Sequence, residues 1–159
     1  MRTLISMLMP IAIGAILTLT VATPATSKDL ATILADGDTL SFTNELGSSM
    51  TLTFKPQQPS QGTFSLTGTF VNRAEGFQCK GTPYPVVGLM DAQSWTLSFS
   101  VAWSDSTQDC NSATGWTGVM KLVNHKPTLQ IFTDWNLSYI GSSGKPEILK
   151  GKDVFTSKN

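Results

Sequence analysis

The sequence predicts an all-β protein, an eight-stranded antiparallel up-and-down barrel, and three observations lead to that prediction. First, apolar and polar residues alternate with a period of two, most regularly in SWTLSFSVAW at 94–103. Second, turn signals rich in Gly, Pro, Asn and Ser separate short strand-like runs, and no window of useful length has helical periodicity. Third, eight such runs with short connections favour a meander that closes on itself, because closure removes exposed strand edges. A two-sheet sandwich is the alternative.

The predicted strands are runs rich in β-branched or aromatic residues, and turn signals such as NELGSS and GSSGKP separate them. In chain order the runs are TLSFTN (39–44), SMTLTF (49–54), TFSLTGTFVN (63–72), YPVVGLM (84–90), SWTLSFSVAW (94–103), SATGWTGVMKL (112–122), TLQIFTDWNLSYI (128–140) and ILKGKDVFTS (148–157).

The chain divides into three parts. Residues 1–25 are expected to be a secretory signal peptide, because an apolar stretch after Arg2 leads into small residues suited to cleavage. Residues 26–38 are expected to be a flexible N-terminal arm, and residues 39–159 a single barrel domain. No other stretch approaches the about 18 apolar residues that a membrane-spanning helix needs. We therefore expect a secreted or periplasmic protein without a membrane partner.

Charge and cysteine content narrow the classes further. The formal net charge is zero and the basic residues are scattered, which argues against a nucleic-acid partner. The two cysteines, Cys79 and Cys110, favour one disulfide in an oxidising compartment. Such a bond would close a loop of about 30 residues and stabilise the fold by about 3–4 kcal/mol. Two buried free thiols are the alternative. Without a CxxC motif, neither a redox nor a metal site is expected.

Polar side chains share the predicted inner face of the barrel with several tryptophans. The face of each strand that carries its apolar residues is taken to point inward. An interior with aromatic walls and polar groups at selected points is typical of a pocket for a small polar ligand. The inward residues of four strands are Ser112, Thr114, Trp116, Met120 and Leu122; Leu129, Ile131, Trp135 and Leu137; Leu149, Asp153 and Phe155; and Phe64, Leu66, Phe70 and Asn72.

Six motifs resemble the avidin and streptavidin family of biotin-binding proteins in order and spacing. They are NELGSS, LTGTFVNRA, FSVAW, CNSATGWTG, FTDWNL and GKDVFT, and the resemblance covers roughly residues 40–157. The stretch VNRA…C…PYP and the paired cysteines are similar in particular to the short, dimeric branch typified by rhizavidin. The resemblance implies high-affinity, non-covalent binding of biotin inside the barrel, without a cofactor, and a homodimer.

The resemblance also implies roles for individual residues. Asn44 and Ser48 would donate hydrogen bonds to the ureido oxygen of biotin. Asn72 and Asp153 would accept hydrogen bonds from its two N–H groups. The Thr114 hydroxyl would face the thioether sulfur, and the Ser112 hydroxyl would meet the valerate carboxylate. The walls would be Trp103, Trp116, Trp135 and Leu137.

Two departures from the family pattern affect the expected site. Phe70 stands where the family has a tyrosine as third donor to the ureido oxygen, and a lost hydrogen bond of this kind costs about 1–3 kcal/mol. The segment SYIGSSGKPEILKGK lacks the tryptophan that tetrameric members lend to a neighbouring subunit, which favours a dimer. We therefore expect Phe77, two residues before Cys79, to act as a lid from within the chain. An exposed phenylalanine on a loop held rigid by the disulfide is the alternative.

Enzymatic activity is not expected. The sequence has no GxSxG, HExxH, P-loop or GxGxxG motif, and its single histidine, His125, falls in a predicted turn. Two other binding functions stay open. The outer surface of a secreted barrel could bind a macromolecule, as lipocalin-like inhibitors do, or the pocket could have changed toward a biotin analogue because of Phe70.

Overall fold

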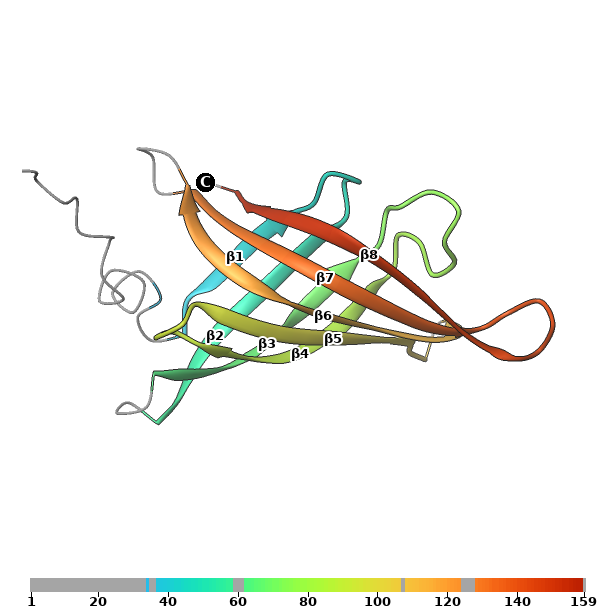
Figure 1. Ribbon diagram of the computed structural model, residues 1–159, viewed down its shortest axis with the longest axis horizontal. Coiled ribbons are helices and arrows are strands. Elements are labelled where there is room, and N and C mark those ends of the chain that lie inside the picture. The colour runs from blue at the N-terminus through green and yellow to red at the C-terminus, as the bar shows by residue number, and fades with distance from the viewer. Residues whose placement is uncertain (1–33, 35–36, 59–61, 107, 124–127, 159) are drawn as a thin grey trace, which may run out of the picture.

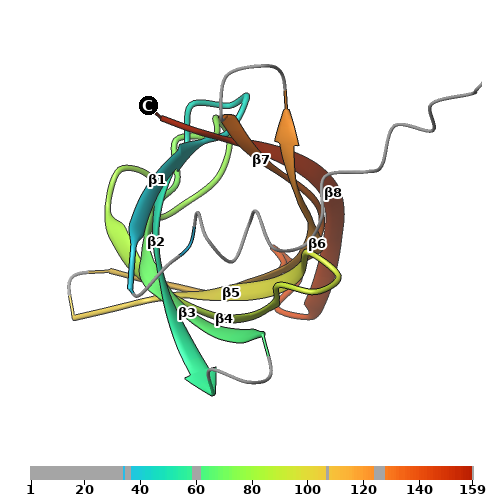
Figure 2. The same cartoon turned by 90° about the vertical axis from the view of Figure 1, so that its left-hand side faces the viewer.

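The protein is a closed antiparallel β-barrel in which each strand pairs with the next along the chain and the last pairs with the first (Figures 1 and 2). The computed structural model describes residues 34, 37–58, 62–106, 108–123 and 128–158. The predicted up-and-down barrel is confirmed, and the two-sheet sandwich is excluded. The strands are β1 (Thr39–Thr43), β2 (Ser49–Gln58), β3 (Thr63–Val71), β4 (Pro83–Asp91), β5 (Thr96–Ser104), β6 (Asp109–Val123), β7 (Thr128–Ile140) and β8 (Pro146–Ser157).

The observed strands match the predicted ones, with differences at their ends. Trp95 was expected to lie within a strand that starts at Ser94, but it lies in the turn before β5 with φ of 59°, so the strand starts at Thr96. Its carbonyl accepts a hydrogen bond from Met120 N at 2.8 Å, and its side chain packs half-buried against the core. Leu122 was expected to face inward but is 40% exposed. The reason is that β5 begins opposite Val119, so Leu122 has a neighbouring strand on one side only.

One end of the barrel, which we call the packed end, is filled by apolar side chains. Strict alternation along β5 buries every second residue, as a half-buried strand requires. The packed end is formed by fully buried residues from four strands: Leu52, Phe54, Leu66, Met90 and Ile131.

The N-terminal region contributes to the same core. Leu34 is fully buried in the core cluster, although it falls within the predicted arm at 26–38. The predicted signal peptide at 1–25 and most of that arm lie outside the described residues, so both boundaries remain predictions. Within the part of the chain that the structure describes, no helix is long and apolar enough to cross a membrane.

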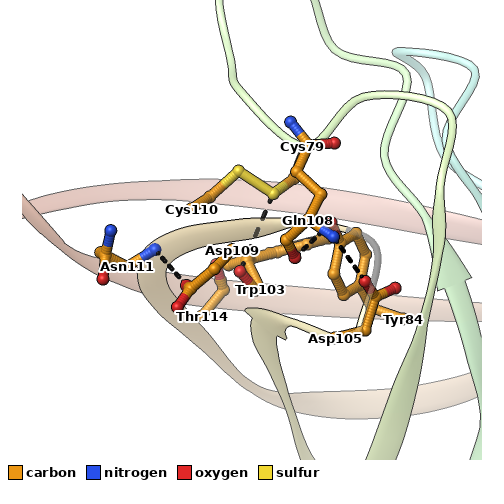
Figure 3. The surroundings of a disulfide bond; sticks show 9 residues. All are labelled: Cys79, Tyr84, Trp103, Asp105, Gln108, Asp109, Cys110, Asn111 and Thr114. Atoms are coloured by element: carbon orange, nitrogen blue, oxygen red, sulfur yellow. Dashed lines mark hydrogen bonds between the residues drawn. A yellow bond between two sulfur atoms is a disulfide. The ribbon is translucent and has the colours of Figure 1, made fainter.

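A disulfide joins Cys79 to Cys110 and confirms the predicted cross-link (Figure 3). It spans 31 residues with a Cα–Cα distance of 6.1 Å, and it ties the loop between β3 and β4 to the start of β6. Cys79 is buried, and its Sγ lies 3.8 Å from the carbonyl oxygen of Trp103. The bond therefore anchors the β3–β4 loop beside the end of β5.

At the opposite end, which we call the open end, the strands are unequal in length. With 15, 13 and 12 residues, β6, β7 and β8 are the longest strands. Figure 1 shows the β7–β8 hairpin reaching beyond the ends of the other strands. The inner face of the hairpin is thereby left partly exposed, which positions its side chains around a cavity.

Candidate functional site

A cavity of about 370 Å³ opens at the open end, within the size range of small-molecule sites. Its lining comes from the β1–β2 and β3–β4 loops and from β3, β5, β6, β7 and β8. All eleven residues to which the sequence analysis gave a role in ligand binding line it: Asn44, Ser48, Phe70, Asn72, Trp103, Ser112, Thr114, Trp116, Trp135, Leu137 and Asp153. The lid candidate Phe77 lines it as well.

Asp153 on β8 is a buried carboxylate held by two donors. Its Oδ2 accepts a hydrogen bond from Trp116 Nε1 at 2.8 Å, and its Oδ1 accepts one from Asn44 Nδ2 at 3.2 Å. Burial raises the pKa of the Asp153 carboxyl above its ordinary value, and the nearby charge of Glu45 adds to that effect. The hydrogen bonds from Trp116 and Asn44 oppose the rise in pKa. The site thus contains a fixed acceptor that is costly to ionise without a further donor.

The β1–β2 loop fixes Asn44 next to this carboxylate. Asn44 Oδ1 accepts hydrogen bonds from the backbone N–H groups of Leu46 at 3.1 Å and Ser48 at 2.8 Å, a local pattern that asparagine favours in turns. Gly47 supplies the positive φ, 79°, that the turn needs. With its carbonyl oxygen used by the loop, the Asn44 amide presents its N–H groups to Asp153 and to the cavity.

Ser48 and Asn72 form a second polar pair. Ser48 Oγ accepts a hydrogen bond from Arg73 N at 2.9 Å and donates one to Asn72 Oδ1 at 3.4 Å. Asn72 Oδ1 also accepts from Ala74 N at 3.0 Å. The backbone contacts fix both oxygen atoms, whereas the long bond between the two side chains is the weaker contact. The serine hydroxyl hydrogen can therefore be redirected at low cost.

Aromatic rings form the walls of the cavity. Trp116 stacks with two rings, with Phe70 at a centroid distance of 5.2 Å and an interplanar angle of 26°, and with Phe99 at 5.1 Å and 13°. Trp103 meets Phe70 edge-on at 5.6 Å, and its Nε1 donates a hydrogen bond to Thr114 Oγ1 at 2.7 Å. Every buried side-chain N or O atom of the described residues has a hydrogen-bond partner. The walls are thus pre-organised by contacts among themselves.

The mouth of the cavity is apolar and exposed. Leu46, Phe77, Ile140 and Leu149 line the cavity and are 56%, 38%, 53% and 42% exposed. Leu149 was expected to face inward, and it does so only at the rim, where the hairpin extends past the other strands.

The sequence analysis missed several lining residues at the rim. Tyr139 could have been found by extending the inward parity of β7 beyond Trp135 and Leu137. Leu46, Ala74, Gly76 and Gln78 lie in loops, where no periodicity indicates orientation.

The charges and ligand atoms around the cavity limit its chemistry. Among the described residues that line it, Asp153 alone carries a formal charge. The described part of the chain contains no group of three or more His, Cys, Asp or Glu side chains placed to hold a metal ion. His125, the single histidine of the sequence, lies outside the described residues. The arrangement is suited to holding a small polar molecule by hydrogen bonds and aromatic contacts.

Comparison with known proteins agrees with this geometry. The profile described as "Avidin family" matches residues 38–158. Afifavidin from Afifella pfennigii is 46% identical over 121 residues, which cover 75% of this chain and 68% of the relative. Hoefavidin from Hoeflea phototrophica is 39% identical over 114 residues, with coverage of 72% and 68%.

Solved structures show the same similarity. The complex of short afifavidin with biotin has 38% sequence identity and a TM-score of 0.67, and the match covers 84% of this chain and all of that one. The rhizavidin–biotin complex has 41% identity and a TM-score of 0.63, with coverage of 76% and 100%. On the strength of the profile match, the sequence identity and the shared barrel, the chain belongs to the avidin family.

Proposed function

We propose that this protein is a non-catalytic, high-affinity biotin-binding protein. The observation that carries the proposal is the buried Asp153 carboxylate, held by Trp116 and Asn44 at the inner end of an aromatic-walled cavity. Family membership supports it, because short afifavidin and rhizavidin have both been solved as biotin complexes. Biotin's ureido group is planar, with an oxygen that needs donors and two N–H groups that need acceptors.

The polar pairs of the cavity match that requirement. The Asn44 amide and the Ser48 hydroxyl would donate to the ureido oxygen, while Asp153 and Asn72 would each accept one N–H. The Ser48 hydroxyl would turn from Asn72 to the ligand, breaking the 3.4 Å bond seen in the ligand-free site. That rotation frees one lone pair of Asn72 Oδ1 for the ligand. An N–H bond to an ionised Asp153 is charge-assisted and among the stronger contacts available.

The remaining residues would hold the rings and tail of biotin. Thr114 accepts from Trp103 through its oxygen, so its own hydrogen is free to face the thioether sulfur. Ser112, at the beginning of β6, would meet the valerate carboxylate nearer the mouth. The walls would be Trp103, Trp116, Trp135 and Leu137.

We further propose that Phe77 closes the mouth as a lid. It is 38% exposed, lines the cavity, and lies two residues from Cys79, which the disulfide ties to Cys110. Replacing Phe77 with Ala should speed biotin dissociation several-fold, roughly 1 kcal/mol of lost apolar burial, without lowering stability. An unchanged dissociation rate would leave Phe77 as a loop residue only. Leu46→Ala, in the β1–β2 loop at the mouth, is the control for general exposure of the rim.

Localisation and assembly belong to the same proposal. We infer a secreted or periplasmic homodimer without a cofactor, and the disulfide supports an oxidising compartment. Light scattering of the purified protein tests the dimer. A protein that binds a macromolecule through its outer surface, or a biotin analogue in its cavity, is the competing function.

A biotin titration followed by calorimetry and tryptophan fluorescence tests the central proposal. We expect one biotin per chain at micromolar protein, and a loss of at least about 100-fold in affinity in Asp153→Ala, because the change removes a charge-assisted bond and leaves two donors unpaired. Asp134→Ala is the matched control, since that aspartate lies on the outer face of β7 with a salt bridge to Lys152. If wild-type protein does not bind biotin, the cavity serves another ligand.

A further inference from the structure

A glycine on β8 makes room for one wall of the cavity. Gly151 lies directly opposite Trp135 in the pairing of β7 with β8, and Trp135 lies opposite Trp116 in the pairing of β6 with β7. A Cβ atom built on Gly151 would be 2.3 Å from Trp135 Cζ2 and 2.6 Å from Cε2. The indole ring therefore occupies the space that any other side chain at 151 would fill.

Backbone freedom does not explain this glycine. Gly151 lies within β8 and does not have the positive φ of the turn glycines such as Gly47 and Gly144. An alanine could adopt the same extended backbone without strain. The close approach of the Trp135 ring is the steric reason for a residue without a side chain.

The position of the Trp135 ring sets the width of the cavity. Trp135 lines the cavity and packs half-buried against the core. Its partners across the sheet are Gly151 of β8 on one side and Trp116 of β6 on the other. A methyl group at 151 would push the ring off β8, and the space open to the displaced ring is the ligand site.

We propose that Gly151 is a positioning residue of the ligand site, which acts by receiving the Trp135 indole and so keeping the cavity wide enough for its ligand. The role in ligand binding rests on the proposed biotin binding. The placement of the Trp135 ring by Gly151 applies to the ligand-free protein as well.

The test compares Gly151→Ala with Gly115→Ala. Gly115 lies next to Trp116 on β6, and a Cβ there would meet no atom within 4 Å. The two variants therefore add the same methyl group to two strands, one against the Trp135 ring and one in open space. We expect biotin to dissociate at least about tenfold faster from Gly151→Ala, the effect of an overpacked site, and within about twofold of wild type from Gly115→Ala.

A double-mutant cycle separates positioning of Trp135 from a general effect on the strand. Trp135→Leu removes the ring atoms that collide with the new methyl group, so adding Gly151→Ala to it should speed dissociation no further. Equal rates for the two alanine variants would overturn the proposal. So would additive effects in the cycle, or failure of Gly151→Ala to fold in the Trp135→Leu background as well.

The ligand-free protein supplies a readout that does not depend on biotin. The near-UV circular dichroism of Gly151→Ala should differ from that of wild type, because the Trp135 ring moves, whereas Gly115→Ala should match wild type. If wild type does not bind biotin but this spectral difference is present, the proposed function is wrong and the positioning role stands. Identical spectra for all three proteins would overturn the positioning role itself.

Discussion

The packed end and the open end of this barrel are built from the same strands and the same alternation of inward and outward residues, yet they do different work. At the packed end the inward residues are Leu52, Phe54 and Ile131, all with no exposed surface. At the open end the same inward parity presents Asn72 and Asp153, and each accepts a hydrogen bond from a distant part of the chain, Asn72 from Ser48 and Asp153 from Trp116. The alternation of inward and outward residues determines the fold, whereas the chemical nature of the inward side chains determines where the site lies.

The two ends also differ in how they contribute to stability. Apolar burial at the packed end stabilises the fold directly. Burying Asp153 at the open end costs free energy that two hydrogen bonds only partly recover. A site that departs from the rules of core packing, while the rest of the barrel keeps them, is where function is expected.

The largest expected effect is the difference in stability lost when a leucine is replaced with alanine at each end of the barrel. Leu52→Ala should lower the free energy of unfolding by about 2–5 kcal/mol, because it leaves a cavity in the packed end. Leu149→Ala makes the same chemical change at the open end, where the side chain is 42% exposed, and should cost less than about 1 kcal/mol. Urea unfolding measures both. Folded Leu52→Ala should still bind biotin with wild-type affinity, and similar losses of stability in the two variants would contradict the division of the barrel.

A second prediction uses pH, because one aspartate at each end has a pKa shifted in the opposite direction. At the open end, the raised pKa of Asp153 means that its contribution to stability is complete below the unfolded-state pKa and is lost as pH rises through the folded-state pKa. At the packed end, hydrogen bonds from Gln93 N and Ser94 lower the pKa of Asp91. Its contribution is therefore present at higher pH and is lost as pH falls through its folded-state pKa.

Unfolding measured from pH 3 to pH 7 in Asp153→Asn and Asp91→Asn checks these signs. Relative to wild type, Asp153→Asn should gain stability as pH rises, and Asp91→Asn should lose it. Parallel curves for the two variants would show that the ends do not differ electrostatically.

The affinity for biotin should rise with pH, whereas the contribution of Asp153 to stability falls as pH rises. A ligand N–H favours the ionised carboxylate, so affinity should fall by up to about tenfold per pH unit as pH drops below the pKa of Asp153. Asp153→Asn should lack that dependence. A flat affinity in wild type would mean that this carboxylate does not meet the ligand in its ionised form.

The sequence was enough to predict the closed barrel and most of the inner face that lines the cavity. Alternation identified all eight strands and placed Thr114, Trp116 and Asp153 on the inner face. It did not show that Trp95 leaves the strand, because a left-handed residue in a turn has no signature in a period of two. It also could not place Leu34 in the core, since an isolated apolar residue before the first strand carries no periodic signal.

The contacts that define the site required the structure. The donors that reach Asp153 are set by the register across strands and by side-chain rotamers. The same holds for the contact of the Trp135 ring with Gly151. Residues 44 and 153 are joined by a hydrogen bond although 109 positions separate them in the sequence. A pairing of that kind follows from barrel closure, which sequence patterning predicts only as a topology.

The smallest expected effect sharpens the comparison within the open end itself. Phe70 and Phe99 both stack on Trp116, but Phe70 lines the cavity and Phe99 does not. Phe70→Tyr adds a hydroxyl on the ligand side and should slow biotin dissociation by about threefold to tenfold, the value of one hydrogen bond of 0.5–1.5 kcal/mol. Stopped-flow displacement of a fluorescent biotin derivative measures the rate.

Phe99→Tyr is the matched control for that change. It adds the same hydroxyl to a phenylalanine that is 3% exposed and does not line the cavity, so it should lower stability through an unpaired buried group and leave dissociation from the folded protein unchanged. If Phe70→Tyr dissociates at the wild-type rate or faster, position 70 does not face the polar end of the ligand. The cavity wall at position 70 would then not be placed to donate a hydrogen bond to the ureido oxygen of biotin. In that case the competing proposal, a biotin analogue as the ligand, would gain support.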